Sequence, residues 1–205
     1  MDRIVIADDH PMFRAALATA VARAAPEAVV VETASLAGAR DALALGPVDL
    51  VLLDLKLSDS EGFAGLVSIR ADFPAAPVAV VSATEDDATI RRALAFGATG
   101  FIPKSAALPD IVKALIAILA GDIWAPALGP DTPTNSIEAR IASLTPSQLK
   151  ILIGLQEGRL NKQIAFDLGV TEATIKAHLT GVFRKLGVHN RTQAVIAAQA
   201  LIPDF

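Results

Sequence analysis

The fold is decided by Arg3-Ile4-Val5-Ile6-Ala7-Asp8-Asp9, a short apolar run that ends in two aspartates. The same pattern returns in Leu50-Val51-Leu52-Leu53-Asp54. Short runs that are apolar at every position are typical of strands buried on both faces, as in a parallel sheet. Ligands of such sheets bind beyond the carboxyl ends of the strands. The three carboxylates therefore predict a cation site there, provided that the first and third strands are neighbours, and Mg²⁺ prefers such oxygen ligands.

The first half of the chain alternates further short apolar runs with amphipathic stretches, and this alternation predicts an α/β doubly wound, five-stranded parallel sheet with helices on both faces. We expect strands at residues 4–7, 29–32, 50–53, 78–82 and 100–103. We expect helices near residues 11–24, 35–45, 62–73, 86–96 and 108–120.

The pattern breaks after Gly121, where proline, glycine, aspartate and serine accumulate as in a linker. The remaining sequence shows no strand pattern, and helix signals predict a small all-α domain. The predicted domains are residues 1–121, a linker at 122–143 with a short helix at 137–141, and residues 144–205. The expected helices of the last domain cover residues 146–157, 161–168, 171–186 and 191–201. Thr145 and Gln148 form a capping box at the start of the first of these helices, and Asn161 can cap the second.

Composition excludes several classes of protein. There are no cysteines, which excludes disulfide frameworks, thiolate metal sites and thiol catalysis. No apolar stretch reaches the roughly 20 residues of a membrane span, and the acidic N-terminus does not resemble a signal peptide. We therefore expect a soluble, cytoplasmic protein with no membrane contact.

Charge is distributed unevenly along the chain. Residues 1–121 hold 15 acidic and 10 basic side chains, whereas residues 144–200 hold three acidic and seven basic ones. An acidic half joined to a basic half indicates that only the second half meets a polyanion. Two ordinary solvated surfaces would give the same counts, so charge alone does not decide.

Two more predicted strands end in reactive groups, Ser82 and Lys104. The Lys104 ammonium would neutralise a phosphoryl oxygen, and the Ser82 hydroxyl would donate to another. One aspartate can accept a phosphoryl group while the others hold the metal. Taken singly, these residues have ordinary structural interpretations, and Asp9 in particular would serve as the cap of the helix at Pro11. Their conjunction at strand ends favours a phosphate-handling site.

At these residues the first half resembles the receiver domain of bacterial two-component response regulators, which has a flavodoxin-like fold. The matching stretches include residues 8–14, 54–57, 81–83 and 100–104. The resemblance implies that a sensor histidine kinase phosphorylates Asp54. It also implies that Asp8, Asp9, Asp54 and the Lys56 backbone carbonyl hold Mg²⁺, and that Lys104 pairs with the phosphoryl oxygens. Ser82 and Phe101 would be the switch pair, with the Phe101 ring turning inward.

The chain departs from the receiver pattern at two positions. The family usually has proline four residues after the phosphorylated aspartate, where Ser58 stands, and often has proline directly after the lysine, where Ser105 stands. Neither change removes a reactive group. We therefore expect a changed loop and an intact site.

The predicted helix at 171–186 decides the role of the second half. Ile175, Leu179, Val182 and Leu186 form an apolar stripe, while Lys176, Thr180 and Arg184 lie on another face. A Thr171-capped helix after a short turn and a shorter helix predicts a helix-turn-helix whose outward face enters the DNA major groove.

Residues 144–200 resemble the LuxR-type DNA-binding domain of NarL/FixJ-class regulators, through stretches such as Asn161-Lys162-Gln163-Ile164-Ala165 and Lys185-Leu186-Gly187-Val188. The resemblance implies that Lys176, Ala177 and Thr180 read base edges. Arg184, Lys185 and Arg191 are better placed for phosphates, which add affinity without sequence information. Thr174 is a further candidate contact, and His178 fits a packing role as well as a backbone contact.

Together, the two resemblances predict a transcription factor that binds promoter operators in double-stranded DNA and dimerises when Asp54 is phosphorylated. It would not be an enzyme, beyond slow autodephosphorylation. Residues 112–120 and the last helix are the candidate dimer surfaces. One alternative is a phosphorylation-independent DNA-binding regulator with a structural receiver domain. Another is a Mg²⁺-dependent phosphohydrolase, which Lys56 disfavours because many such enzymes need an acid there.

Overall fold

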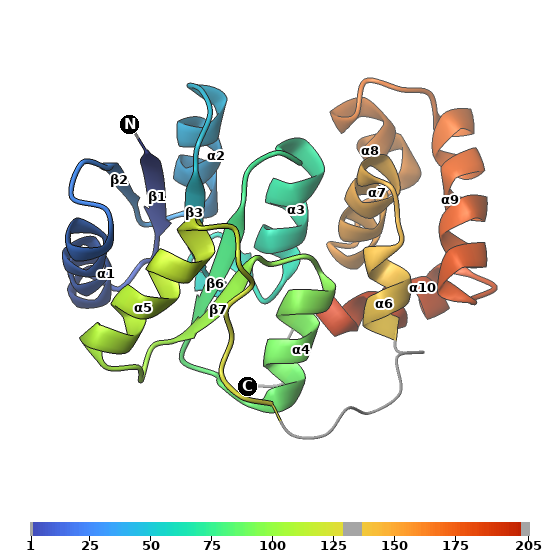
Figure 1. The fold of residues 1–205 in the computed structure, drawn as a ribbon. Helices are drawn as coiled ribbons and strands as arrows, with labels where there is room; N and C mark the ends of the chain where they lie inside the picture. The colour runs from blue at the N-terminus through green and yellow to red at the C-terminus, as the bar shows by residue number, and fades with distance from the viewer. Residues whose placement is uncertain (1, 129–136, 202–205) are drawn as a thin grey trace. The chain divides into compact units, whose positions relative to one another are not determined.

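The computed structural model describes residues 2–128 and 137–201. The described residues divide into two compact units, 2–128 and 137–201. The first unit is α/β and the second is helical, as the sequence predicts. Each unit is described by itself below (Figure 1).

The first unit is built on a five-stranded parallel sheet with the strand order β2-β1-β3-β6-β7. The first and third predicted strands are therefore neighbours, as the acidic site requires. The strands are β1 (Arg3–Ala7), β2 (Val29–Thr33), β3 (Leu50–Asp54), β6 (Val78–Ser82) and β7 (Gly100–Pro103).

Helices cover both faces of the sheet (Figure 1). The helices of this unit are α1 (Pro11–Ala24), α2 (Leu36–Ala44), α3 (Ala64–Asp72), α4 (Asp87–Ala95) and α5 (Leu108–Leu119). Alternate strand residues such as Ile4, Ile6 and Leu52 pack against Leu17 of α1 and Leu115 of α5 in one apolar core. That core fixes the sheet, so the residues beyond its strands have defined positions.

Two pieces of local structure in this unit lie outside the predicted elements. Residues after β3 form a small antiparallel pair, β4 (Lys56–Leu57) with β5 (Ser60–Glu61), around the Ser58 position. Beyond α5, Trp124 forms a parallel bridge to Gly100, and its carbonyl accepts a 2.8 Å hydrogen bond from the Phe101 N–H. The first residues of the predicted linker thus extend the edge of the sheet at β7.

The second unit consists of helices that pack on one another. Its elements are α6 (Ile137–Ala142), α7 (Pro146–Gln156), α8 (Asn161–Asp167), α9 (Glu172–Leu186), α10 (Arg191–Ala198) and the 3₁₀ turn η1 (Gln199–Leu201). The capping box expected from Thr145 and Gln148 opens α7. Gly187 ends α9 in the left-handed conformation, at φ +71°, which favours glycine.

Two helix starts differ from the sequence interpretation. The N-cap of α8 is Leu160 and not Asn161, and the Gln163 side chain accepts the Leu160 N–H at 2.7 Å. The N-cap of α1 is His10, without a side-chain cap, so Asp9 does not serve that helix. In both cases the polar side chain that could cap the helix has another partner. Asn161 accepts from Arg191, and Asp9 lies against His10.

Candidate functional site

The predicted site residues of the first unit meet at the carboxyl edge of the sheet. Asp8 follows β1, Asp54 ends β3, Ser82 ends β6 and Lys104 follows β7. The strand register aligns the ends of β6 and β7 at this edge. Ser82 pairs with Pro103, and the Lys104 N–H donates to the Ser82 carbonyl at 2.8 Å. Parallel pairing therefore gathers four chemically active residues from four separate parts of the chain.

The Lys104 ammonium lies between two buried carboxylates. Its Nζ is 2.7 Å from Oδ2 of Asp54, to which it donates a hydrogen bond, and 2.8 Å from Oδ2 of Asp8. The Asp8 and Asp54 side chains are almost wholly buried, and the lysine side chain is 12% exposed. Buried charges of this kind are tolerated only when they are paired, so Lys104 compensates the two aspartates.

The environment of Asp54 disfavours its charged form. Burial raises the pKa of the Asp54 carboxyl above its ordinary value, and the Asp8 carboxylate adds to that rise. The Lys104 ammonium and the Lys56 backbone N–H, which donates to Oδ1 at 3.1 Å, lower the same pKa but do not offset burial. A perturbed carboxylate with a specific charged partner is a candidate reactive group.

Several oxygen atoms at this edge are available to a cation. Asp8, Asp9, His10 and Asp54 each offer a ligand atom, and these atoms lie within 4.8 Å of one another. Among the described residues, no hydrogen bond reaches the buried Oδ2 of Asp8 or Oδ1 of Asp9. Oδ2 of Asp8 is in ion-pair contact with the Lys104 ammonium, and Oδ1 of Asp9 lies 2.8 Å from Nδ1 of the His10 ring. Such a donor set fits a hard divalent cation.

Sequence reasoning assigned no role to two residues that shape this edge. His10 directs Nδ1 to within 2.8 Å of Asp9 Oδ1 and 3.3 Å of Asp8 Oδ1, although its side chain is 63% exposed. Arg14 donates from Nη1 to the Asp8 carbonyl at 2.7 Å and pairs with Glu32. Only the position of His10 directly after Asp8-Asp9 signals a role, and nothing in the sequence links Arg14 to a backbone carbonyl.

The predicted switch residues are both buried. The Ser82 side chain accepts a hydrogen bond from the Thr84 N–H at 3.1 Å, so the β6–α4 loop holds its oxygen. Phe101 has no exposed surface. The Phe101 ring is therefore already buried in this conformation, and the predicted inward turn would start from a buried ring.

The predicted DNA-reading helix is α9 of the second unit. Thr171 caps it by accepting the Thr174 N–H at 3.2 Å, and its apolar stripe is buried as predicted. The side chains predicted to read bases lie away from this stripe, on another face of the helix. The exposed residues among those predicted to contact DNA are Lys176, Ala177, Thr180 and Arg184.

Four other predicted DNA contacts have partners within the unit or are partly covered. Lys185 donates from Nζ to the Ser143 carbonyl at 2.7 Å, and Arg191 donates to the Arg159 carbonyl at 2.6 Å. The half-buried Thr174 shares its hydroxyl with Thr171, and His178 is also half-buried. These groups are thus less free to reach DNA than those on the open face of α9.

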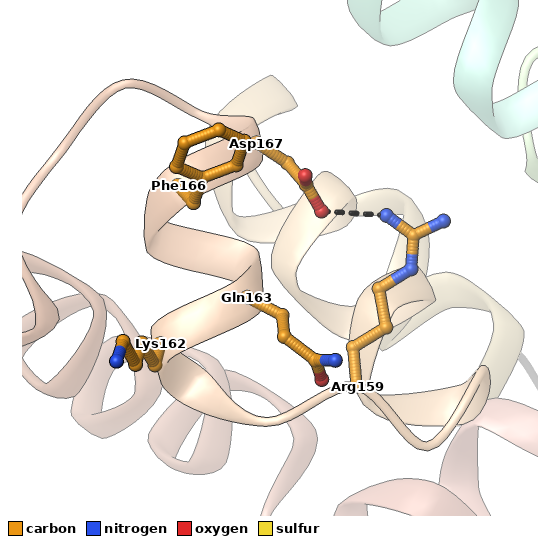
Figure 2. Close-up of a pocket in the computed structure, with 5 residues that line it drawn as sticks. All are labelled: Arg159, Lys162, Gln163, Phe166 and Asp167. Carbon is orange, nitrogen blue, oxygen red and sulfur yellow. Dashed lines mark hydrogen bonds and ion pairs between the residues drawn. The ribbon is translucent and has the colours of Figure 1, made fainter.

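A hollow of about 390 Å³ lies beside α8 in the same unit. Figure 2 shows Arg159, which precedes the helix, joined to Asp167 in its last turn. The other lining residues are Lys162, Gln163 and the 86% exposed Phe166. Because Arg159 also pairs with Glu157 at 2.8 Å, its charge is largely compensated. None of the predicted site residues lines this hollow.

Both units match families of known proteins. The model of the response regulator receiver domain matches residues 4–116, and that of the luxR family of bacterial regulatory proteins matches residues 142–198. This chain belongs to the LuxR-type response regulators. The receiver sheet carries the acidic edge, and the LuxR-type unit carries α9. As a member of this family the response regulator is a transcription factor.

Curated relatives match this response regulator along nearly its full length. The glycerol metabolism activator of Pseudomonas putida is 38% identical and covers 97% of this chain and 95% of its own. The nitrate/nitrite response regulator NarL of Escherichia coli K12 is 31% identical, with coverages of 94% and 93%. The LnrK regulator of Bacillus subtilis is also 31% identical, with 96% of each chain covered.

Solved structures support the fold. RcsB of Salmonella enterica serovar Typhimurium, bound to promoter rprA with the phosphomimetic BeF₃⁻, is 22% identical to the response regulator, with a TM-score of 0.56. It covers 98% of this chain and 99% of its own. A LuxR family regulator from Silicibacter pomeroyi is 34% identical over 62% of this chain and 98% of its own, with a TM-score of 0.55. In the described residues, no helix is long and apolar enough to cross a membrane.

Proposed function

We propose that a sensor histidine kinase phosphorylates Asp54 and that this modification switches dimerisation and sequence-specific DNA binding. The observation that carries the proposal is the placement of Asp54 Oδ2, which is 2.7 Å from Lys104 Nζ beside the buried Asp8 carboxylate. An aspartate oxygen attacks the phosphorus, and the phosphoryl group leaves the kinase histidine. Lys104 then pairs with the new phosphoryl oxygens, which are stronger partners than a single carboxylate oxygen.

The acidic edge is suited to hold Mg²⁺ during this transfer. The carboxylates of Asp8, Asp9 and Asp54 and the backbone carbonyl of Lys56 would be its protein ligands. A bound Mg²⁺ offsets negative charge on the transferring group. The buried Oδ2 of Asp8 and Oδ1 of Asp9, which accept no hydrogen bond from the residues that the structure describes, support this assignment. Slow autodephosphorylation is the only enzymatic step that we assign to the chain.

The output side of the proposal concerns Ser82, Phe101 and a dimer. A phosphoryl group on Asp54 would accept a hydrogen bond from the Ser82 hydroxyl. The Ser82 oxygen already accepts one from the Thr84 N–H, so movement of Ser82 toward the phosphoryl group would carry the β6–α4 loop with it. Of the apolar surfaces predicted for dimerisation, Ile116 on α5 is 52% exposed and Ile196 on α10 is 58% exposed, whereas Leu201 is buried. We therefore assign dimer contacts to the exposed faces of α5 and α10.

The DNA side of the proposal rests on α9. We assign base readout to Lys176, Ala177 and Thr180, since lysine donates to guanine O6/N7 and small side chains contact the thymine methyl group. A phosphate contact is assigned to Arg184. A dimer would place two such helices in successive major grooves of a promoter operator, about one helical turn apart. Its place of action is proposed to be the cytoplasm.

A phosphorylation assay on the full-length chain tests this proposal. The chain is incubated with Mg²⁺ and a small phosphodonor such as acetyl phosphate, and phosphate incorporation and DNA affinity are both measured. We expect incorporation on wild type, none on Asp54→Ala, and tighter DNA binding only when Asp54 is phosphorylated. Equal DNA affinity with and without incorporated phosphate would instead support a phosphorylation-independent regulator.

A further inference from the structure

The ring of Phe13 faces the Lys104 ammonium. Pro11 is the first residue of α1, so Phe13 lies in the first helical turn, directly after the acidic loop. Its ring is half-buried and packs against the core between the sheet, α1 and α5. The Lys104 Nζ lies 5.0 Å from the ring centroid. That separation is within the roughly 6 Å over which a cation is attracted to an aromatic face.

The ring differs from the other partners of Lys104 in one physical respect. The two carboxylates hold the ammonium by charge, at 2.7 Å for Asp54 and 2.8 Å for Asp8. A lysine ammonium is a point charge on a flexible stem and has little preferred geometry of its own. When Asp54 carries a phosphoryl group, its carboxylate contact with Lys104 is lost. The neutral ring keeps its attraction for the ammonium, because that attraction does not depend on Asp54.

We propose that Phe13 is a positioning residue for Lys104, whose ring keeps the ammonium at the acidic edge when a phosphoryl group occupies Asp54. The inference rests on the proposed role of Asp54 as phosphoacceptor. The ring lies over one side of the ammonium, and the Lys104 side chain is only 12% exposed. An ion pair so sheltered from water is stronger, which favours pairing with phosphoryl oxygens. The contact of Phe13 with the acidic edge is the one to the Lys104 ammonium, so its proposed effect passes through Lys104.

Beryllofluoride, a phosphomimetic, provides the probe. Its affinity for the full-length chain is measured with Mg²⁺ by calorimetry in wild type, Phe13→Leu and Phe13→Tyr. Leucine fills the space with an apolar side chain but has no ring, whereas tyrosine keeps the ring. We expect Phe13→Leu to weaken beryllofluoride binding by about threefold to tenfold and Phe13→Tyr to stay within about twofold of wild type.

A second series separates ring electronics from packing. Phenylalanine at position 13 is replaced by analogues that carry one, two or three ring fluorines, which weaken the attraction for cations while largely keeping the shape. We expect affinity to fall with each added fluorine while the melting temperature stays constant. The matched control is Phe63→Leu, because Phe63 stacks on Arg92 at 5.1 Å in the same unit. It should lower the melting temperature without a selective loss of beryllofluoride affinity.

The outcomes distinguish this inference from the proposed function. If wild type does not bind beryllofluoride, the assignment of Asp54 fails. If wild type binds and Phe13→Leu binds equally well, the positioning role is overturned. It is also overturned if Phe13→Leu and Phe13→Tyr lose affinity together in proportion to their melting temperatures, or if fluorination has no effect.

Discussion

The Arg191 guanidinium at the start of α10 donates to the Asn161 side chain at the start of α8, with Nη1 3.3 Å from Oδ1. A second donor, Nη2, lies 2.6 Å from the Arg159 carbonyl. Arg191 thus ties two helix starts together across 30 residues of sequence. The arginine that sequence reasoning assigned to DNA phosphate has an architectural role in the folded unit.

Substitution of Arg191 should therefore affect DNA binding indirectly. We expect Arg191→Ala to lower affinity for a mixed-sequence duplex while leaving the salt dependence of binding close to that of wild type. Arg184→Ala is the matched comparison, since Arg184 is exposed on α9. Its loss should reduce the slope of log affinity against log salt by about 0.9 for each bound protomer. Equal reductions in slope for both variants would show that Arg191 contacts phosphate directly.

Lys176→Ala tests base readout by α9. Lysine at this exposed position donates to guanine in the proposed complex, and one such contact contributes about 1–3 kcal/mol of discrimination. We expect affinity for an operator selected on wild type from random duplexes to fall by about tenfold or more, with a much smaller loss on mixed-sequence DNA. The control is Lys162→Ala on α8, which should weaken both duplexes alike. A uniform loss for Lys176→Ala would assign that lysine to phosphate.

The glycine at the end of α9 offers a test of local stability. Gly187 has φ +71°, and an added Cβ would lie 2.7 Å from Nη1 of Arg140. That guanidinium donates to the Leu186 carbonyl. Gly158 has a similar φ of +77° but open space around the added atom. We expect Gly158→Ala to cost roughly 1–2 kcal/mol through the left-handed backbone alone, and Gly187→Ala to cost more.

Denaturant unfolding of the full-length chain measures both glycine substitutions. The difference between the two losses in free energy of unfolding gives the cost of displacing the Arg140 guanidinium from the Leu186 carbonyl. Equal costs would mean that Arg140 adjusts to the added methyl group without losing that hydrogen bond.

The buried Asp54 carboxylate should make stability depend on pH. Its pKa is raised in the folded chain, chiefly by burial, so the stability linked to this group is full below its unfolded pKa and is lost as pH rises through the folded pKa. Asparagine does not ionise, so the Asp54→Asn variant does not lose this stability as the pH rises. In the absence of divalent cations, we expect the advantage of Asp54→Asn over wild type to increase with pH and then level off above the folded pKa of Asp54.

Thermal unfolding of both chains between acidic and neutral pH checks this expectation. Asp41→Asn, at an exposed position of α2, is the matched control and should differ little from wild type at any pH. A stability difference between Asp54→Asn and wild type that stays constant with pH would contradict the proposed cost of burying this charge.

Local sequence patterns were sufficient to predict most helices and strands of both units. The apolar run before Asp8 predicted β1, and the Thr145 capping signal predicted the start of α7. Their physical basis is local, because strand burial, helix periodicity and end caps depend on residues a few positions apart. The β4–β5 pair was missed because its two-residue strands have too few positions for a periodic signal. The cap predicted at Asn161 was wrong because a distant arginine holds its side chain.

By itself, the sequence determined which residues end the strands and which face of α9 carries lysine, because a strand or helix repeats its faces with a fixed period. The tertiary structure alone decided which of those residues touch. The order β2-β1-β3-β6-β7 brings Lys104 between Asp8 and Asp54. Packing of α1 on the sheet sets the Phe13 ring against the same ammonium. Contacts between residues tens of positions apart depend on how whole elements pack, and no local pattern encodes that packing.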